Sequence, residues 1–229
     1  MRIDRFLSNL KYGTRKDIQK AIKRKQVFLN NNLVTNGSIK INQNIDKVTF
    51  DDELVYYKET ILLMMNKPKG YVSATKDGKE KTVLELIDLP YSRFDLNIAG
   101  RLDKDTEGLL LLTNNGKLLH NIISPNKDVY KKYFVRVEKP FRKLKKLEGN
   151  YEILDGRSFT FVPSSPITER INDFEFYLSI KEGKFHQVKR MVEHFSNKVT
   201  YLKRVQIGQI KLDENLKLGE YKEIIDYLI

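Results

Sequence analysis

The sequence predicts two unequal domains, each of which combines helices with β-strands. The chain has 229 residues, 40% of them hydrophobic, enough for one substantial core and a small second module. Near the amino terminus, apolar residues recur at helical spacing, whereas several later segments are short apolar runs or alternate between apolar and polar residues. Because a polar connector occupies residues 51–58, we place the domains at residues 1–58 and 59–229.

The first domain is expected to begin with two short helices and a hairpin. Apolar residues from Ile3 to Leu10 have helical spacing, and Gly13 ends that helix. Thr14 is a favourable N-cap, so a second helix is expected over residues 15–25. The Asn-rich turn within residues 27–34 then predicts a hairpin.

The charge of the chain indicates a polyanionic partner. The formal net charge is +12, and residues 1–58 carry twelve Lys or Arg against six Asp or Glu. For a protein of this composition, nucleic acid is a better candidate than an acidic membrane. The outer face of the second helix could be merely solvated, but an ordinary solvated face intersperses acids with bases. We therefore expect this helix to bind RNA through Arg15, Lys16, Lys20, Lys23, Arg24 and Lys25.

Composition excludes several classes of site. Without cysteine there is no disulfide, thiolate metal site or cysteine nucleophile. The three histidines lack metal-ligand spacing, and no glycine-rich nucleotide loop is present, so neither a metal nor a cofactor is expected. Ile61 to Met65 is too short to span a membrane, and the amino terminus lacks the apolar core of a signal peptide. We expect a monomeric cytoplasmic protein.

The acidic stretch from Asp103 to Glu107 is the best candidate for the chemistry. It opens into Leu109–Leu112, which predicts a loop mounted on a fully buried strand. A calcium loop is disfavoured because its twelfth ligand would fall on Asn114. Two further interpretations are open. The stretch could be a solvated acidic turn without a chemical role, or Asp103 and Asp105 could act as the paired carboxylates of a glycoside hydrolase.

Several other elements follow from periodicity. Strands are expected at residues 61–65, 131–137, 173–180 and 199–207, the last with Lys203 and Arg204 pointing outward. Helices are expected at residues 82–89, 117–123 and 141–147 and over the amphipathic stretch ending at Phe195. Pro68 and Gly70 should end the first strand of this domain, leaving Lys67 at its end.

Three motifs resemble those of the pseudouridine synthases of the RsuA and RluB type. They are Lys-Pro-x-Gly at residues 67–70, Gly-Arg-Leu-Asp-x-Asp-Thr-x-Gly at residues 100–108, and Gly-Lys-Phe-His-Gln-Val-Lys-Arg-Met at residues 183–191. The resemblance implies that Asp103 is the catalytic aspartate, that Lys189 pairs with it and that Tyr133 stacks on the target base. It implies RNA contacts for Arg101 and Arg190, whereas His186 is interpreted as structural.

The amino-terminal pattern is similar to the alpha-L RNA-binding module named after ribosomal protein S-four. It comprises Arg-Ile-Asp-Arg-Phe-Leu-Ser-Asn, then Gly-Thr-Arg-Lys, then Lys-Arg-Lys-Gln-Val-Phe-Leu-Asn, all within residues 2–30. Together the two resemblances imply an α+β protein. A small α-rich RNA-binding domain would precede a catalytic domain whose mixed, mainly antiparallel sheet is flanked by helices.

The resemblance implies isomerisation of uridine to pseudouridine in ribosomal RNA. The third motif and the short carboxyl end match the RsuA branch, which implies one uridine of 16S small-subunit RNA, of the uridine-516 type, as the substrate. Two alternatives stay open. One is a 23S ribosomal RNA pseudouridine synthase of the RluB or RluF type, and the other is a non-catalytic RNA-binding factor for ribosome assembly.

Overall fold

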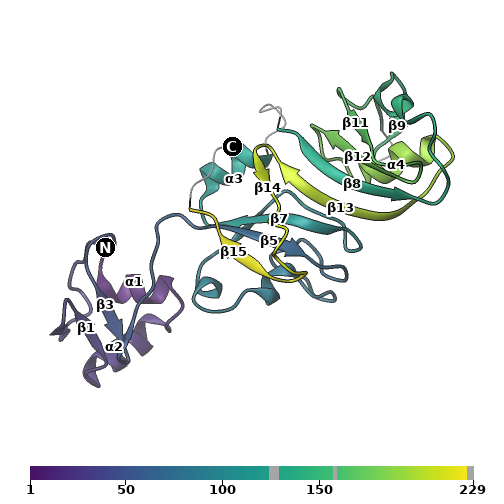
Figure 1. Ribbon diagram of the computed structural model, residues 1–229. Helices are drawn as coiled ribbons and strands as arrows, with labels where there is room; N and C mark the ends of the chain where they lie inside the picture. The colour runs from purple at the N-terminus through teal and green to yellow at the C-terminus, as the bar shows by residue number, and fades with distance from the viewer. Residues whose placement is uncertain (124–128, 157–158, 226–229) are drawn as a thin grey trace. The chain divides into compact units, whose positions relative to one another are not determined.

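The computed structural model describes residues 1–123, 129–156 and 159–225, and the chain divides into two compact units (Figure 1). The first unit comprises Met1–Ile61 with Ile87–Asp95, and the second comprises Leu62–Leu86 with Leu96–Ile229. Each unit is thus assembled from two separate stretches of the chain. The single boundary near residue 58 stays a prediction.

The first unit contains two helices and a four-stranded antiparallel sheet in the order β2-β1-β3-β4. Its elements are α1 Ile3–Asn9, α2 Arg15–Lys23, β1 Val27–Leu29, β2 Asn32–Leu33, β3 Val48–Phe50 and β4 Glu53–Leu54. Thr14 and Asp17 form a reciprocal capping box at the start of α2. The helix ends two residues earlier than predicted, and Lys25 beyond it has a left-handed backbone with φ of 62°.

The polar connector expected from the sequence is partly wrong. Asp51 and Asp52 both have positive φ, 52° and 65°, and they form the turn that joins β3 to β4. These acidic residues therefore continue the first sheet, because Asp is among the few residue types that adopt two consecutive left-handed conformations at low cost.

The second unit is built on a mixed sheet in the order β11-β12-β8-β13-β7-β5-β15, with β14 paired to β13 and β6 paired to β7. Every pairing in this sheet is antiparallel except that of β13 with β7, so the predicted α+β class and sheet type are confirmed. The strands are β5 Leu62–Lys67, β6 Asn97–Ala99, β7 Glu107–Thr113, β8 Lys131–Val137, β11 Ile167–Arg170, β12 Glu175–Ile180, β13 Val199–Ile207, β14 Ile210–Lys211 and β15 Tyr221–Glu223.

The core of the second unit lies on β5 and β7. Every residue of both strands is buried, as expected for central strands whose sequences are apolar runs. Helix α3, Gly116–Ile123, covers one face and contributes Leu118 and Ile122 to a cluster with Leu109 and Leu111. The Asn115 side chain caps this helix by accepting hydrogen bonds from the amides of residues 117 and 118.

The remaining helices are shorter than predicted. Helix α4 spans Gln187–His194 and contacts β13 and the small hairpin of β9 Ile153–Leu154 and β10 Thr160–Phe161 (Figure 1). The helices expected at residues 82–89 and 141–147 are wrong, because only 3-10 turns form, at Val83–Leu86 and Leu144–Glu148. The first turn ends at Leu86, and the second begins only at Leu144 and has Gly149 as its C-cap. Among the described residues, no helix has the length and apolar character needed to cross a bilayer.

Candidate active site

The acidic loop connects β6 to β7 and folds back on itself. The Asp103 carbonyl accepts a hydrogen bond from the Thr106 amide at 3.1 Å, which closes a tight turn around Lys104 and Asp105. The Asp103 side chain is 25% exposed, so its carboxylate is accessible from the surface. The loop that carries this carboxylate leads into β7, which is buried along its whole length. The buried strand gives the loop a rigid support.

Lys67 donates hydrogen bonds to the backbone of this turn. Its side chain is fully buried at the end of β5, and its ammonium donates to the carbonyls of Thr106 at 2.9 Å and Asp103 at 3.1 Å, with further contacts to Pro68 and Lys104. Burial lowers the pKa of Lys67 to about 8, against the opposing effect of the nearby acidic residues. The sequence placed this lysine correctly at a strand end but gave no sign that it binds the acidic loop.

Arg204 also donates hydrogen bonds to the loop that joins β6 to β7, and its predicted outward orientation is wrong. Successive strand residues alternate in direction, and Arg204 is only 2% exposed. Along one edge of β7, β13 pairs with residues 107–108 and β6 pairs with residues 111–113. The Arg204 guanidinium fills the interval by donating to the Leu109 carbonyl at 2.8 Å and the Gly100 carbonyl at 3.1 Å.

Gly108 lies where this packing leaves no room for a side chain. A Cβ atom there would come within 2.2 Å of the Arg204 carbonyl oxygen, and the residue has φ of +102°. Only glycine satisfies both conditions without strain. The glycine at the end of the acidic motif therefore has a structural explanation.

Lys189, in the first turn of α4, brings a positive charge to the two acids. Its Nζ lies 3.1 Å from Asp103 Oδ2 and 2.7 Å from Asp105 Oδ1. Burial alone would lower the pKa of Lys189, but the hydrogen bond to Asp105 and the charge of Asp103 outweigh it and raise that pKa. For Asp105, burial raises the pKa and Lys189 outweighs it, so the pKa is lowered. Both groups are therefore charged at neutral pH.

The carboxylate of Asp103 borders a cavity of about 820 Å³. Tyr133, on β8, is 7% exposed and lines this cavity, as do Arg101 and His186. The His186 Nε2 atom lies 3.6 Å from Asp103 Oδ1, and the histidine begins α4 with a left-handed φ of 54°. The structure thus places Asp103 and Tyr133 on one cavity, with an aromatic wall and a volume suited to a nucleoside, and Lys189 joins them from α4 through its ion pair with Asp103.

Comparison with known proteins agrees with this arrangement. Residues 61–194 match the family described as RNA pseudouridylate synthase. The chain belongs to the RNA pseudouridylate synthase family. Residues 1–44 match the S4 domain, so the predicted amino-terminal RNA-binding module is confirmed. The predicted pseudouridine synthase relationship is confirmed as well, and the protein is an RNA pseudouridine synthase, an isomerase.

Relatives of known sequence and structure cover almost the entire chain. An uncharacterised RNA pseudouridine synthase of Bacillus subtilis is 39% identical over 99% of this chain and 95% of its own. The ribosomal small subunit pseudouridine synthase A of Haemophilus influenzae is 37% identical over 98% of this chain and 96% of its own. A crystal structure of a pseudouridylate synthase has a TM-score of 0.67 at 35% identity, covering 98% of this chain and 96% of that one.

Within this pseudouridylate synthase, the residues expected to contact RNA differ in their environments. All six basic residues predicted on the S4 domain are exposed, and Lys20 has an ion pair of 3.8 Å with Asp17. Arg101 is exposed and lines the cavity that Asp103 borders. Arg190 instead donates from one nitrogen to the carbonyls of Leu154 and Asp155, each at 2.8 Å. Its predicted contact with phosphate stays untested.

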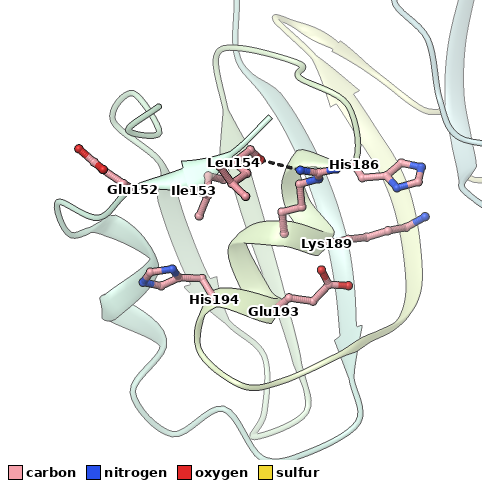
Figure 2. A pocket seen from close by; sticks show the side chains of 8 residues that line it. Glu152, Ile153, Leu154, His186, Lys189, Glu193 and His194 are labelled. Carbon is pink, nitrogen blue, oxygen red and sulfur yellow. Dashed lines mark hydrogen bonds between the residues drawn. The ribbon is translucent and has the colours of Figure 1, made fainter. Parts of the chain in front are cut away.

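Figure 2 shows the residues of a second, smaller hollow, between α4 and the β9 segment. Its volume is about 420 Å³, and its lining includes His186, Lys189 and Glu193 from successive turns of the helix together with residues 152–154 of the β9 segment. His186 and Lys189 project from the helix toward the same side (Figure 2). Both residues line this hollow and also approach Asp103. The hollow is therefore separated from the Asp103 carboxylate only by these two side chains.

Proposed function

We propose that the protein isomerises one uridine of 16S ribosomal RNA, of the uridine-516 type, with Asp103 as the nucleophile. The observation that carries this proposal is the 3.1 Å ion pair between Lys189 Nζ and Asp103 Oδ2 at a cavity lined by Tyr133. The Haemophilus influenzae relative is named for activity on the ribosomal small subunit, which favours 16S over 23S RNA.

The reaction requires one reactive carboxylate and a firm hold on a detached base. The N1–C1′ bond of uridine breaks, the base turns over, and a C5–C1′ bond forms, while the proton on C5 is released and N1 takes up a proton. Asp103 forms a covalent bond to the substrate, at ribose C1′ or at base C6, and is later expelled. Lys189 favours the ionised carboxylate, and Tyr133 stacks on the base to retain it.

Access to a stacked uridine requires base flipping. Extruding a nucleotide costs a few kcal/mol, roughly, by analogy with enzymes that act on flipped bases. Contacts to the RNA backbone would offset this cost, and Arg101 and the exposed cations of α2 are available for that role. We also propose that the enzyme acts in the cytoplasm as a monomer, the oligomeric state being open to measurement by size-exclusion chromatography with light scattering.

Tritium release from RNA labelled at uridine C5 tests the proposal. The substrates are 16S and 23S transcripts and partly assembled ribosomal subunits, and Asp103→Asn serves as the control that keeps the side-chain size. Release from 16S material alone, abolished in the control, is the expected result. Release from 23S RNA alone would overturn the substrate assignment, and undiminished release by Asp103→Asn would remove the aspartate from its role.

A further inference from the structure

Phe185, directly before α4, exposes an aromatic ring beside the reactive acid. The residue is 58% exposed although it is one of the larger apolar side chains, and it lines the same cavity as Asp103 and Tyr133. An exposed phenylalanine on an ordinary surface needs no explanation. Its position on the wall of a cleft that receives a nucleoside does call for one.

The ring is fixed before any ligand arrives. It stacks on the imidazole of His186, with ring centroids 3.8 Å apart and planes inclined by 18°. On another side it meets the β9–β10 hairpin, where a Cβ atom at Gly156 would lie 2.7 Å from Phe185 Cδ1. The absence of a side chain at Gly156 thus allows the hairpin backbone to approach the ring. A ring held on two sides loses little conformational entropy when a third group stacks on it.

One cation lies beside Phe185, and a second lies over the ring of Phe161 on β10. The Arg190 guanidinium carbon lies 5.8 Å from the Phe185 ring centroid, and Arg190 is itself anchored to the hairpin carbonyls. Lys184 Nζ lies 4.3 Å from the Phe161 ring centroid. Aromatic rings interleaved with Lys and Arg are typical of surfaces that bind single-stranded RNA, because bases stack on the rings and phosphates approach the cations.

The aromatic pair is adjacent to the reaction centre. His186 Nε2 is 3.6 Å from Asp103 Oδ1, so a base stacked on Phe185 lies one aromatic layer from the residue that approaches the carboxylate. Tyr133 is already assigned to the target base. The nucleotide that can reach Phe185 is consequently one next to the target in the same strand.

We propose that Phe185 is a stacking site for the unpaired base that neighbours the flipped uridine. This inference rests on the proposed role of the Asp103 cleft in isomerisation. It assigns a contact outside the target nucleotide and predicts that recognition needs an unpaired neighbour. The site acts on binding of RNA, whereas Asp103 acts on the chemical step.

The test compares Phe185→Leu and Phe185→Tyr in the full-length enzyme. The RNA is a short oligonucleotide containing the uridine identified by tritium release. Leucine keeps an apolar side chain but removes the π-face, so Kd should rise about tenfold, as expected for loss of one base–aromatic stack. Tyrosine keeps the ring, so its Kd should stay within about twofold of the unaltered enzyme. For Phe185→Leu, the rise in Kd should exceed any fall in the rate at saturating RNA.

Abasic nucleotides placed in turn on either side of the target complete the test. One of them should weaken binding about tenfold for the unaltered enzyme and less than about twofold for Phe185→Leu, because the stack is already lost. Equal losses in both proteins at both positions, or unaltered binding by Phe185→Leu, would refute the stacking site and leave the ring a packing role against the hairpin. If tritium release identifies no target uridine in 16S material, the substrate proposal fails instead.

Discussion

Replacing the buried Lys67 by methionine should separate the activity of the enzyme from its stability. The substitution keeps an unbranched side chain of similar length and removes the ammonium beneath the acidic turn. The carbonyls of Pro68 and Thr106 lose their Lys67 donor, whereas those of Asp103 and Lys104 keep second donors, the amides of Thr106 at 3.1 Å and Gly70 at 2.9 Å. The substitution therefore weakens the hydrogen bonding of two carbonyl acceptors rather than four.

The expected change in unfolding free energy is small because two terms oppose each other. Two weakened buried acceptors cost about 2–6 kcal/mol together. Lowering the pKa of Lys67 from 10.5 to about 8 means that burial disfavours its charged form by about 3 kcal/mol, which the substitution relieves. The net loss at pH 7 should therefore stay below about 3 kcal/mol. The turn carrying Asp103 would nevertheless loosen, and a displacement of about 1 Å in a reacting group can cost about a hundredfold in kcat.

The assays are urea unfolding and tritium release at saturating RNA. The matched control is Lys69→Met, since Lys69 is an exposed lysine on the same turn. We expect Lys67→Met to lower kcat about a hundredfold with less than about 3 kcal/mol of destabilisation. The control should cost no more than about 1 kcal/mol, for the loss of its exposed contact with the Tyr201 ring. Unaltered kcat, or a loss of stability well above this limit, would refute the assigned role of Lys67.

The pH dependence provides a second test of Lys67. Between about 8 and 10.5, the unfolded chain holds a proton that the folded protein has released, so the unfolding free energy should rise with pH across this window. Lys67→Met should lack this rise. Titration of the ¹³C-labelled lysine ε-carbon should give a midpoint near 8, and a midpoint near 10.5 would contradict the effect of burial.

Further predictions concern the acid pair, the loop glycine and the S4 domain. Lys189→Ala should lower product formation at saturating RNA about a hundredfold while changing RNA affinity little, and unchanged turnover would remove Lys189 from the site. The pKa of Lys189 is raised above 10.5, so the stability from its ion pair should be constant from pH 6 to 9 and be lost only as pH rises through that higher value, which urea unfolding at several pH values would check. Gly108→Ala should lower the unfolding free energy by about 1–3 kcal/mol through backbone strain, and by more through the clash with the Arg204 carbonyl. A loss below about 1 kcal/mol in urea unfolding would contradict the packing argument. Lys16→Ala and Lys23→Ala should each make the negative slope of log Kobs against log salt shallower by about 1 if these lysines contact phosphate. Unchanged slopes would exclude such contacts.

The sequence predicts elements well where the pattern is local. The Leu109–Leu112 run and the alternation around Tyr133 identified β7 and β8, because burial on two faces or on one leaves a direct trace in composition. The helices expected at residues 82–89 and 141–147 failed for the opposite reason. A favourable cap and apolar residues favour a turn there, but the first turn ends at Leu86 and the second begins only at Leu144, and no local signal marks these two positions.

The candidate site divides in the same way. Motif resemblance pointed to Asp103, Tyr133 and Lys189, whose roles remain proposals, and the family relationship that the resemblance implied is confirmed. Of the two cations that support the acidic loop, Lys67 belongs to the first motif but shows no sign there of its contacts with the loop, and Arg204 carried no recognisable signal. Each looks like an ordinary basic residue in a turn or on a strand, because a one-dimensional pattern does not record which backbone carbonyls lie opposite a side chain.

The sequence by itself determined the two-domain composition, the family and the residue types available for chemistry, since these depend on composition and on motifs contiguous in the chain. The tertiary structure alone decided that Lys189 Nζ lies 3.1 Å from Asp103, that Phe185 stacks on His186 beside it, and that Arg204 is buried. These facts arise from strand pairing between distant segments, notably β13 with β7, whose register is fixed by the burial of whole faces rather than by any single residue.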